Sequence, residues 1–569
     1  MRKHQTDILI LGSGGAGLFA ALHAHQANPK LSITVAVKGL LGKCGCTRMV
    51  QGGYNVALAA GDSIERHFMD TIEGGKWLPH QELAWRLVTV AVERIRELEN
   101  ELGCFFDRNP DGTVHQKAFA GQTFDRTVHK GDLTGIEIIN RLAEQVWARD
   151  IRRLEEHRAI ELIKSKDGKS IAGVLMIDVR TGEFVLVQAK AVLLATGGGP
   201  TMYKYHTPSG DKSCDGMAMA LRAGLALRDM EMVQFHPTGL LAGMHTRMTG
   251  TVLEEGLRGA GGYLLNGAKQ RFMDKYDTRG ERATRDIVSR GIFAEMRSGN
   301  VTANGGVYIS MAHLGSASVR KQFKGMVERC ADCGFDLAGG LVEVVPTAHY
   351  MMGGVVFDVD CSTELPGLFS AGEDTGGVHG ANRLGGNGVA NSTVYGGIAG
   401  EAMAPWVAQQ DTFPDYDEQA IALAVARAQH PLTQPAGDIA ALRDELYESM
   451  WDDAGIVRDA ASLQRADDKL DELDARLDQT GIAASDLRFN LTWHDWLNLK
   501  SLILVSKSIT AAATARENSR GAHYRTDFPE AGDLESSRFT CVRLEEGKFD
   551  ITTRPVEFTR VKPGETLIA

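Results

Sequence analysis

TDILILGSGGAG, residues 6–17, decides the fold of this chain. Its first seven residues form a short run rich in isoleucine and leucine, which is typical of a buried strand in a parallel sheet. Gly12, Gly14 and Gly17 then make a G-x-G-x-x-G turn that opens an apolar helix, and residues 32–37 provide the next strand. These glycines allow a tight turn and bring backbone N–H groups close to a pyrophosphate at the helix N-terminus. The sequence therefore predicts a βαβ nucleotide-binding unit.

The residue after the second strand separates two kinds of nucleotide site. An NAD site usually has a carboxylate there to hold a ribose hydroxyl, whereas this chain has Lys38, which counts against a simple NAD enzyme. Further buried strands are predicted at 190–199 and 366–376, each with glycines near its end. Strands so far apart predict one nucleotide-binding domain interrupted by insertions, with the His-, Arg- and Gly-rich tract 235–350 as a capping domain. Residues 417–480 and 494–518 are predicted to be helices.

Composition bounds the class of protein. The 569 residues exceed what one core organises, and the formal net charge of −11 argues against a general nucleic-acid binder. No apolar run approaches the ~18–20 residues of a membrane span, and the N-terminus lacks the features of a signal peptide. Eight cysteines in so long a chain form no disulfide framework, and reduced thiols fit the cytosol. We therefore expect a cytoplasmic protein.

Several motifs follow one another along the chain in a specific order. They are GSGGAG at 12–17, ATGGG at 195–199, QFHPTG at 234–239, PTAHYMMGG at 346–354, HGANRLGGNG at 379–388 and ENSRGAHYRTDFPE at 517–530. This order resembles that of the succinate dehydrogenase and fumarate reductase flavoproteins, and L-aspartate oxidase shares it. The resemblance covers nearly the whole chain. It implies an α/β fold with a Rossmann-like FAD-binding domain (1–234 and 351–405), an inserted α+β capping domain (235–350) and a C-terminal helical domain and tail (406–569).

The resemblance implies FAD as the cofactor. The stretch Gln51-Gly52-Gly53 would lie against the isoalloxazine ring, and Glu373 and Asp215 would lie near the nucleotide. The full set of implied cofactor contacts is Gly12, Gly14, Gly15, Gly17, Lys38, Cys46, Thr47, Gln51, Gly52, Gly53, Asp215, Glu373 and Asn387.

Cys46 marks a departure from the membrane-bound relatives, in which a histidine at this position is bonded to the flavin. Three interpretations follow. We favour non-covalent FAD with Cys46 as a small buried side chain; the alternatives are a thioether to the flavin ring, because a thiolate is a good nucleophile, and a metal site. Cys44 and Cys46 have no His or Cys cluster beside them, so we expect no metal. The lone C-x-x-C of Cys330 and Cys333 is interpreted as a helix end.

The reaction of the family moves a hydride between flavin N5 and one carbon of a small dicarboxylate, with a proton at the neighbouring carbon. It requires cations for two carboxylates and an acid–base group on the face opposite the flavin. His236, His349 and Arg383 match the family's motifs for the carboxylate clamps. Arginine suits this role because its planar fork meets a carboxylate in two hydrogen bonds.

Arg285 falls where the family places its proton-transferring arginine. An arginine alone is a poor acid, since its pKa is above ~12, but desolvation and a proton relay make the role plausible. Glu255 and Arg258 match the relay positions, and Asp286, which follows Arg285, is placed to orient it.

Two further positions bear on the identity of the acid. The relatives carry a threonine that hydrogen-bonds a substrate carboxylate where this chain has Glu254. An ionised carboxylate there would repel a substrate carboxylate. Glu254 therefore turns away, pairs with a base such as Arg247, or faces a different substrate, either an amino acid or a related acid with one carboxylate replaced. Aspartate oxidase has a glutamate in the loop covering its substrate, but this chain has Phe119, as do the dicarboxylate dehydrogenases.

We therefore predict the flavoprotein subunit of a succinate dehydrogenase- or fumarate reductase-like enzyme that acts on a small carboxylate. If FAD is non-covalent, enoate reduction is favoured, because the covalent bond in relatives raises the flavin potential. Electrons would pass through an iron–sulfur partner subunit, since the chain lacks a cluster-binding cysteine set. Such partners could hold the protein at the inner face of the membrane. The alternatives are an L-aspartate oxidase-like enzyme and a flavin-holding assembly or electron-relay subunit without substrate chemistry.

Overall fold

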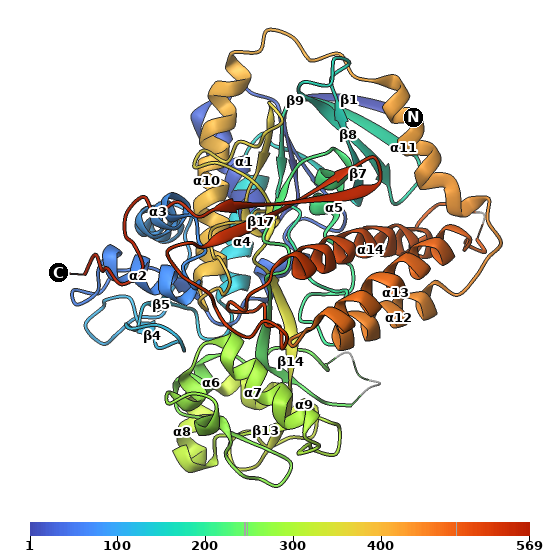
Figure 1. Ribbon diagram of the computed structural model, residues 1–569. Helices are drawn as coiled ribbons and strands as arrows, with labels where there is room; N and C mark the ends of the chain where they lie inside the picture. The colour runs from blue at the N-terminus through green and yellow to red at the C-terminus, as the bar shows by residue number, and fades with distance from the viewer. Residues whose placement is uncertain (244–245, 247, 485, 569) are drawn as a thin grey trace.

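The computed structural model describes residues 1–243, 246, 248–484 and 486–568. The structure has three parts: a mixed sheet, a capping domain and a helical layer (Figure 1). This arrangement confirms the predicted fold class. Among the described residues no helix has the length and apolar character needed to cross a bilayer.

The central sheet has seven strands. Its order is β6 (Arg152–Glu155), β2 (Ile33–Val37), β1 (Arg2–Leu11), β9 (Phe184–Leu194), β8 (Ile171–Asp178) and β7 (His157–Lys164), with β16 (Leu368–Ser370) also on β9. The first four strands and β16 run parallel to one another. β8 is antiparallel to its neighbour β9, and β7 is antiparallel to β8. β8 pairs with the first half of β9 and β16 with its last three residues. The strands expected near 6–12, 32–37, 190–199 and 366–376 all belong to this sheet.

The glycine turn after β1 packs too closely for any side chain. Gly12 has φ +111°, and a Cβ there would lie 2.1 Å from the carbonyl oxygen of Ala195. A Cβ on Gly17 would lie 2.0 Å from the Gly12 oxygen, so helix α1 (Gly15–Ala27) could not approach β1. The turn therefore places the N-terminus of α1 at the carboxyl edge of the sheet.

Helices and short strands cover the sheet. Helix α10 (Asn387–Ala408) lies along α1 at a distance that only small residues allow, since a Cβ on Gly396 would lie 2.5 Å from the Ala16 oxygen. A three-stranded sheet of β3, β5 and β4 stands beside them. The other elements of this part are η1 (Cys46–Met49), β3 (Tyr54–Asn55), α2 (Ile64–Gly74), α3 (Gln81–Asn100), β4 (Gln116–Lys117), β5 (Thr127–Val128), α4 (Thr134–Trp147), α5 (Asp215–Arg222), β10 (Leu227–Arg228), β15 (Gly354–Val355) and η5 (Gly372–Asp374).

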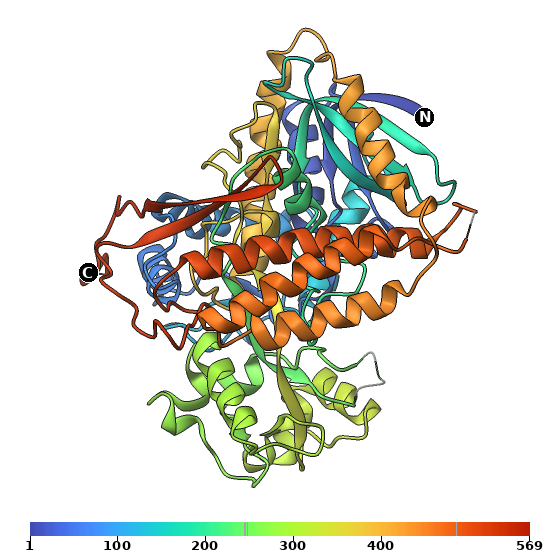
Figure 2. The ribbon, with the colours of Figure 1, turned by 45° about the vertical axis from the view of Figure 1, so that its right-hand side comes forward.

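The capping domain is built on an antiparallel sheet of order β11-β14-β13-β12. Strands β11 and β14 lead out of and back into the nucleotide-binding part, so they cross the junction between the two (Figures 1 and 2). The elements are β11 (Val233–Leu240), α6 (Gly256–Gly259), β12 (Tyr263–Leu265), η2 (Met273–Lys275), η3 (Gly280–Arg282), α7 (Arg285–Arg297), β13 (Val307–Ser310), η4 (Ala312–Leu314), α8 (Ser316–Gln322), α9 (Lys324–Asp332) and β14 (Val342–Met351). Cys330 lies in α9 and Cys333 caps it, which confirms that this C-x-x-C is a helix end.

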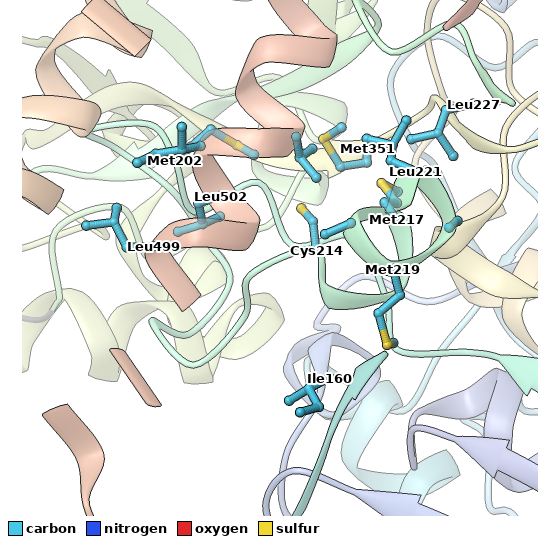
Figure 3. Packing of buried hydrophobic residues seen from close by; sticks show 14 of the residues in the cluster. Ile160, Met202, Cys214, Met217, Met219, Leu221, Leu227, Met351, Leu499 and Leu502 are labelled. Carbon is cyan, nitrogen blue, oxygen red and sulfur yellow. The ribbon is translucent and has the colours of Figure 1, made fainter. Parts of the chain in front are cut away.

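The C-terminal part is a helical layer followed by a hairpin. Its elements are α11 (Glu418–Gln429), η6 (His430–Leu432), α12 (Ile439–Asp453), α13 (Ala460–Asp478), α14 (Leu491–Ala515), β17 (Arg538–Glu545) and β18 (Lys548–Pro555). The helices lie where the sequence predicts them. The hairpin was not predicted, because β17 pairs with β10 from a distant part of the sequence. Figure 3 shows the core that joins α14 to α5, in which Leu499 and Leu502 pack near Cys214 and Met217.

Candidate active site

A long cavity runs from the glycine turn to the capping domain. Its nucleotide end is lined by the turn Gly12–Ala16, by Thr47 and by Gly197. The hydroxyl of Thr47 accepts a hydrogen bond from the Gly15 N–H at 3.0 Å, which fastens η1 to the first turn of α1. Side chains on Gly12 or Gly15 would fill this space or strike its wall. The backbone of α1 is thus open to a negatively charged group.

Lys38 and Asp215 meet in the wall of this end. The Lys38 Nζ lies 2.9 Å from Asp215 Oδ2 and 3.1 Å from Asn498 Oδ1, and Arg158 donates to Asp215 Oδ1 at 2.8 Å. Burial alone would raise the pKa of Asp215, but Arg158 and Lys38 outweigh it and hold that pKa well below its usual range. Lys38 is therefore occupied in fixing an ionised Asp215, which lines the cavity.

Glu373 faces the middle of the cavity from η5. Its Oε1 accepts hydrogen bonds from the Met351 N–H at 3.0 Å and the Gly199 N–H at 3.4 Å. Burial raises its pKa to about 7 in spite of these two donors. Glu373 can thus be either donor or acceptor toward a ligand near neutral pH.

The loop 46–53 forms the next part of the wall. A Cβ on Gly52 would lie 2.4 Å from Phe119 Cζ, and Gly53 has φ +145° with Val128 O 2.3 Å from its Cβ position. The loop therefore lies flat against Phe119 and β5. The Oε1 atom of Gln51 is buried and accepts no hydrogen bond from any described residue, so it is available to a bound group.

A chain of buried charged groups reaches the far end of the cavity. Arg258 donates to Glu255 Oε1 at 2.5 Å, and Glu255 Oε2 accepts from Arg285 NH2 at 2.6 Å and Nε at 3.0 Å. The remaining nitrogen, Arg285 NH1, donates to Gln234 Oε1 at 2.9 Å. All four side chains are at most 6% exposed, and Glu255 and Arg285 line the cavity.

The electrostatics of this chain keep Glu255 ionised. Burial would raise the pKa of Glu255, but Arg285 and Arg258 outweigh burial and lower it. Burial lowers the pKa of Arg258 from the ordinary arginine value. A low dielectric strengthens these attractions.

His236, His349 and Arg383 converge on the same end. The two imidazole centroids lie 5.3 Å apart, and His349 Nδ1 is 2.9 Å from the Thr207 hydroxyl. The Arg383 guanidinium lies 4.3 Å from the Tyr350 ring; its NH1 donates to a backbone oxygen at 3.3 Å, and its Nε has no hydrogen-bond partner in the described part of the chain.

These three side chains differ in charge. Burial, followed by the field of Arg285, lowers the pKa of both imidazoles well below the usual value, so they are neutral near pH 7. Burial and then Arg285 lower the pKa of Arg383 to about 10, which leaves it charged. Arg383 is thus a buried cation with donors free for an anion.

Glu254 lines the cavity beside Glu255 and is 5% exposed. Its Oε2 accepts from Lys117 Nζ at 3.0 Å. Of the three sequence-based alternatives the structure shows pairing with a base, but the base is Lys117 on β4; Arg247 lies outside the described residues. Burial raises the pKa of Glu254, and Lys117 opposes that rise.

Matches to two protein-family models show to which family the chain belongs. A family model described as an FAD binding domain matches residues 7–389, and one described as the fumarate reductase flavoprotein C-terminus matches residues 443–567. The chain belongs to the succinate dehydrogenase and fumarate reductase flavoprotein family. This flavoprotein is therefore an FAD-dependent oxidoreductase of that type.

Individual relatives match the flavoprotein over most of their length. A CoM/CoB-type fumarate reductase chain of Methanothermobacter marburgensis is 40% identical over 93% of this chain and 95% of the relative. The fumarate reductase flavoprotein of Escherichia coli is 34% identical over 99% of this chain and 97% of the relative. A solved mutant structure of the E. coli quinol fumarate reductase chain FrdA has a TM-score of 0.93 and 33% identity, covering 99% of both chains.

The cavity of the flavoprotein fits FAD. The glycine turn leaves space and N–H groups for a pyrophosphate, Asp215 and Glu373 offer carboxylates along the wall, and the unpartnered Gln51 oxygen faces the middle. All but two of the predicted cofactor contacts line this cavity. Gly17 supports the turn from behind, and Asn387 is buried among Asn55, His67 and Thr71.

Sequence reasoning missed two partners in the flavoprotein's site and misjudged a third residue. Gln234 holds Arg285 and Lys117 holds Glu254; Gln234 stands inside the QFHPTG motif, and Lys117 lies two positions before Phe119. Asp286 does not orient Arg285: its nearest ionic partner is Arg290 at 3.5 Å, because consecutive residues at the start of α7 point to different sides. In the described part of the chain no three His, Cys, Asp or Glu side chains gather as metal ligands.

Proposed function

We propose that this flavoprotein interconverts a small carboxylic acid and its enoate, with Arg285 delivering or removing the proton. The observation that carries the proposal is the buried chain Arg258–Glu255–Arg285, which ends at the wall of a cavity with a free cation, Arg383. Bound FAD would supply hydride transfer at flavin N5. The residues of the chain bind and orient the acid and move its proton.

The carboxylate clamp follows from charge and hydrogen bonding. Arg383 offers donors to one substrate carboxylate, and the neutral His236 and His349 offer further hydrogen bonds beside it. Fixing the acid at one end restricts the carbon that can face Arg285. Phe119, which packs beside Gly52 in the cavity wall, would shield that side of the bound acid from water.

Proton transfer is assigned to Arg285. Its guanidinium is 6% exposed and held by Glu255 and Gln234, so its orientation is fixed. Once it gives a proton to the substrate, Arg258 can replace that proton by passing one to the ionised Glu255, which hands it on to Arg285. Arg258 also donates to the Glu281 backbone oxygen at 2.7 Å, which fixes the outer end of the chain.

We further propose that FAD is bound without a covalent bond and that a separate subunit carries electrons. Burial raises the pKa of the Cys46 thiol to about 12, so the reactive thiolate is scarce at neutral pH. Several relatives are named as subunits of fumarate reductases, and we propose an iron–sulfur partner for this chain on that ground.

An anaerobic assay tests the proposal. The purified yellow protein is mixed with reduced methyl viologen and a panel of small mono- and dicarboxylic enoates, and viologen oxidation is followed. We expect oxidation with at least one enoate. Hydrogen peroxide from aspartate in air, or no turnover with any acid while FAD stays bound, would contradict the proposal and favour an oxidase or a relay subunit respectively.

A further inference from the structure

Glu254 presents an unusual group at the substrate end of the cavity. It is a carboxylate in the cavity wall, near Thr251 and Val252 in sequence. Arg285 and Arg383, which line the same end, are positively charged. The neighbouring carboxylate, Glu255, is already paired with two arginines. The structure gives Glu254 no role in the chain that holds Arg285.

Lys117 fixes the orientation of Glu254 and opposes the rise in its pKa that burial causes. Its Nζ lies 3.0 Å from Oε2 and 3.3 Å from the Gly131 oxygen, and it stands 5.8 Å from the Phe119 ring. Lys117 does not belong to the cavity wall, so it holds the carboxylate from behind. A ligand in the cavity therefore meets the glutamate and not the lysine.

The second oxygen of Glu254 is the part open to a ligand. Oε1 accepts no hydrogen bond from any residue that the structure describes, whereas Oε2 is occupied by Lys117. A ligand that displaces water from this oxygen without offering a donor would leave it unsatisfied, which is costly. A substrate that brings an N–H or O–H donor to Oε1 would satisfy it, and a second carboxylate would be repelled.

We infer that Glu254 sets the substrate class: one carboxylate binds at Arg383, and a neutral hydrogen-bond donor such as a primary amide binds at Glu254. The inference rests on the proposed function and narrows it. The favoured substrate is then the monoamide of an enedioic acid rather than the dicarboxylate itself. Reduction adds two electrons and two protons across the carbon–carbon double bond in either case, with reduced viologen as the electron source in the assay.

Three substrates of one shape separate charge from hydrogen bonding. Fumarate carries two carboxylates, its monomethyl ester carries one carboxylate and no donor, and its monoamide carries one carboxylate and an N–H donor. For the wild type we expect kcat/KM for the monoamide to exceed that for fumarate at least tenfold and to exceed that for the ester. In Glu254→Gln the ratio of kcat/KM for the monoamide to kcat/KM for fumarate should fall at least tenfold. Comparing this ratio between the variant and the wild type cancels differences in intrinsic reactivity between the substrates.

Glu295→Gln provides the matched control. Glu295 is also a buried glutamate of the capping domain paired with a lysine, Lys275 at 3.5 Å, but it lies outside the cavity wall. This variant should keep the wild-type ratio. A wild type that prefers fumarate, or a ratio unchanged in Glu254→Gln, would overturn the inference while leaving the proposed function in place. Failure of all three substrates would overturn the inference, and the proposed function falls only if the wider panel of enoates fails as well. The ratio of kcat/KM for the monoamide to that for fumarate, measured for the wild type, tests the inference even if a variant does not fold.

Discussion

The two ends of the cavity are built on different physical principles. At the nucleotide end, the shape of the site comes from absent side chains, since Gly12, Gly17 and Gly52 allow contacts that a Cβ would block. At the substrate end, the site consists of long charged side chains whose positions depend on one another, as in the chain from Arg258 to Arg285. The first kind of site is fixed by local backbone packing, and the second by pairs of residues distant in sequence.

The largest effect is expected from a substitution that disrupts FAD binding at the nucleotide end. In Gly12→Ala the new Cβ would lie 2.1 Å from the Ala195 oxygen, at a backbone φ of +111°. Overpacking of this kind costs about 1–3 kcal/mol, and about 1.4 kcal/mol corresponds to a factor of ten in affinity. We expect FAD affinity to fall about 5- to 160-fold, with FAD content after gel filtration and activity falling as a result. Gly210→Ala, which meets nothing within 4 Å, is the control; equal FAD content in both variants would contradict the packing argument.

A second change sharpens the contrast at the substrate end. Glu255→Gln keeps the size of the side chain but removes the charge between Arg258 and Arg285. Proton relays of this kind contribute about 10²–10⁴-fold to rate, so kcat should fall at least about a hundredfold with FAD retained. Glu343→Gln, a buried glutamate on β14 outside the cavity, should keep kcat. Equal kcat in the two variants would show that the network is structural only.

Glu373 tests how the middle of the cavity responds to pH. Because its pKa in the folded protein is raised from the ordinary 4.5 to about 7, the folded state binds this proton more tightly than the unfolded state. Its contribution to stability is complete below pH 4.5 and is lost as pH rises through 7, with an upper bound of about 3 kcal/mol. In FAD-depleted protein, Glu373→Gln should flatten the fall in melting temperature between pH 5 and 8. Glu535→Gln, at an exposed site, should reproduce the wild-type slope.

The smallest expected effect concerns Cys46. If FAD is non-covalent, Cys46→Ser should change kcat by less than about twofold, since only a protonated side chain of similar size is replaced. Acid precipitation of the wild type should leave the yellow colour in the supernatant. Colour that stays with the wild-type polypeptide but not with Cys46→Ser would instead establish a thioether.

The sequence allowed the nucleotide end to be predicted in more detail than the substrate end. Residues 6–17 determine their own local structure, because the strand, the glycine turn and the helix follow one another directly in sequence. β1 and α1 lie where these residues predict them. The hairpin β17–β18 escaped prediction because its main support, β10, is distant in sequence.

At the substrate end, family resemblance named the charged residues but not what holds them. Gln234 lies in a quoted motif and Lys117 close to Phe119, yet their partners Arg285 and Glu254 lie 51 and 137 positions away. Asp286 was assigned to Arg285 by adjacency alone, and the turn of the helix separates them. Local pattern therefore predicted which side chains carry charge, and only the fold showed how the charges pair.

Single-turnover kinetics of Arg285→Ala test the central claim most directly. The protein is reduced anaerobically with dithionite and mixed with the enoate that the wild type reduces fastest, and reoxidation of the flavin is followed by absorbance. Arg297→Ala, at the far end of the same helix α7, controls for folding. The account predicts full FAD content in both variants, wild-type reoxidation in Arg297→Ala and a loss of about 10³-fold or more in Arg285→Ala. Reoxidation of Arg285→Ala at the wild-type rate would contradict it.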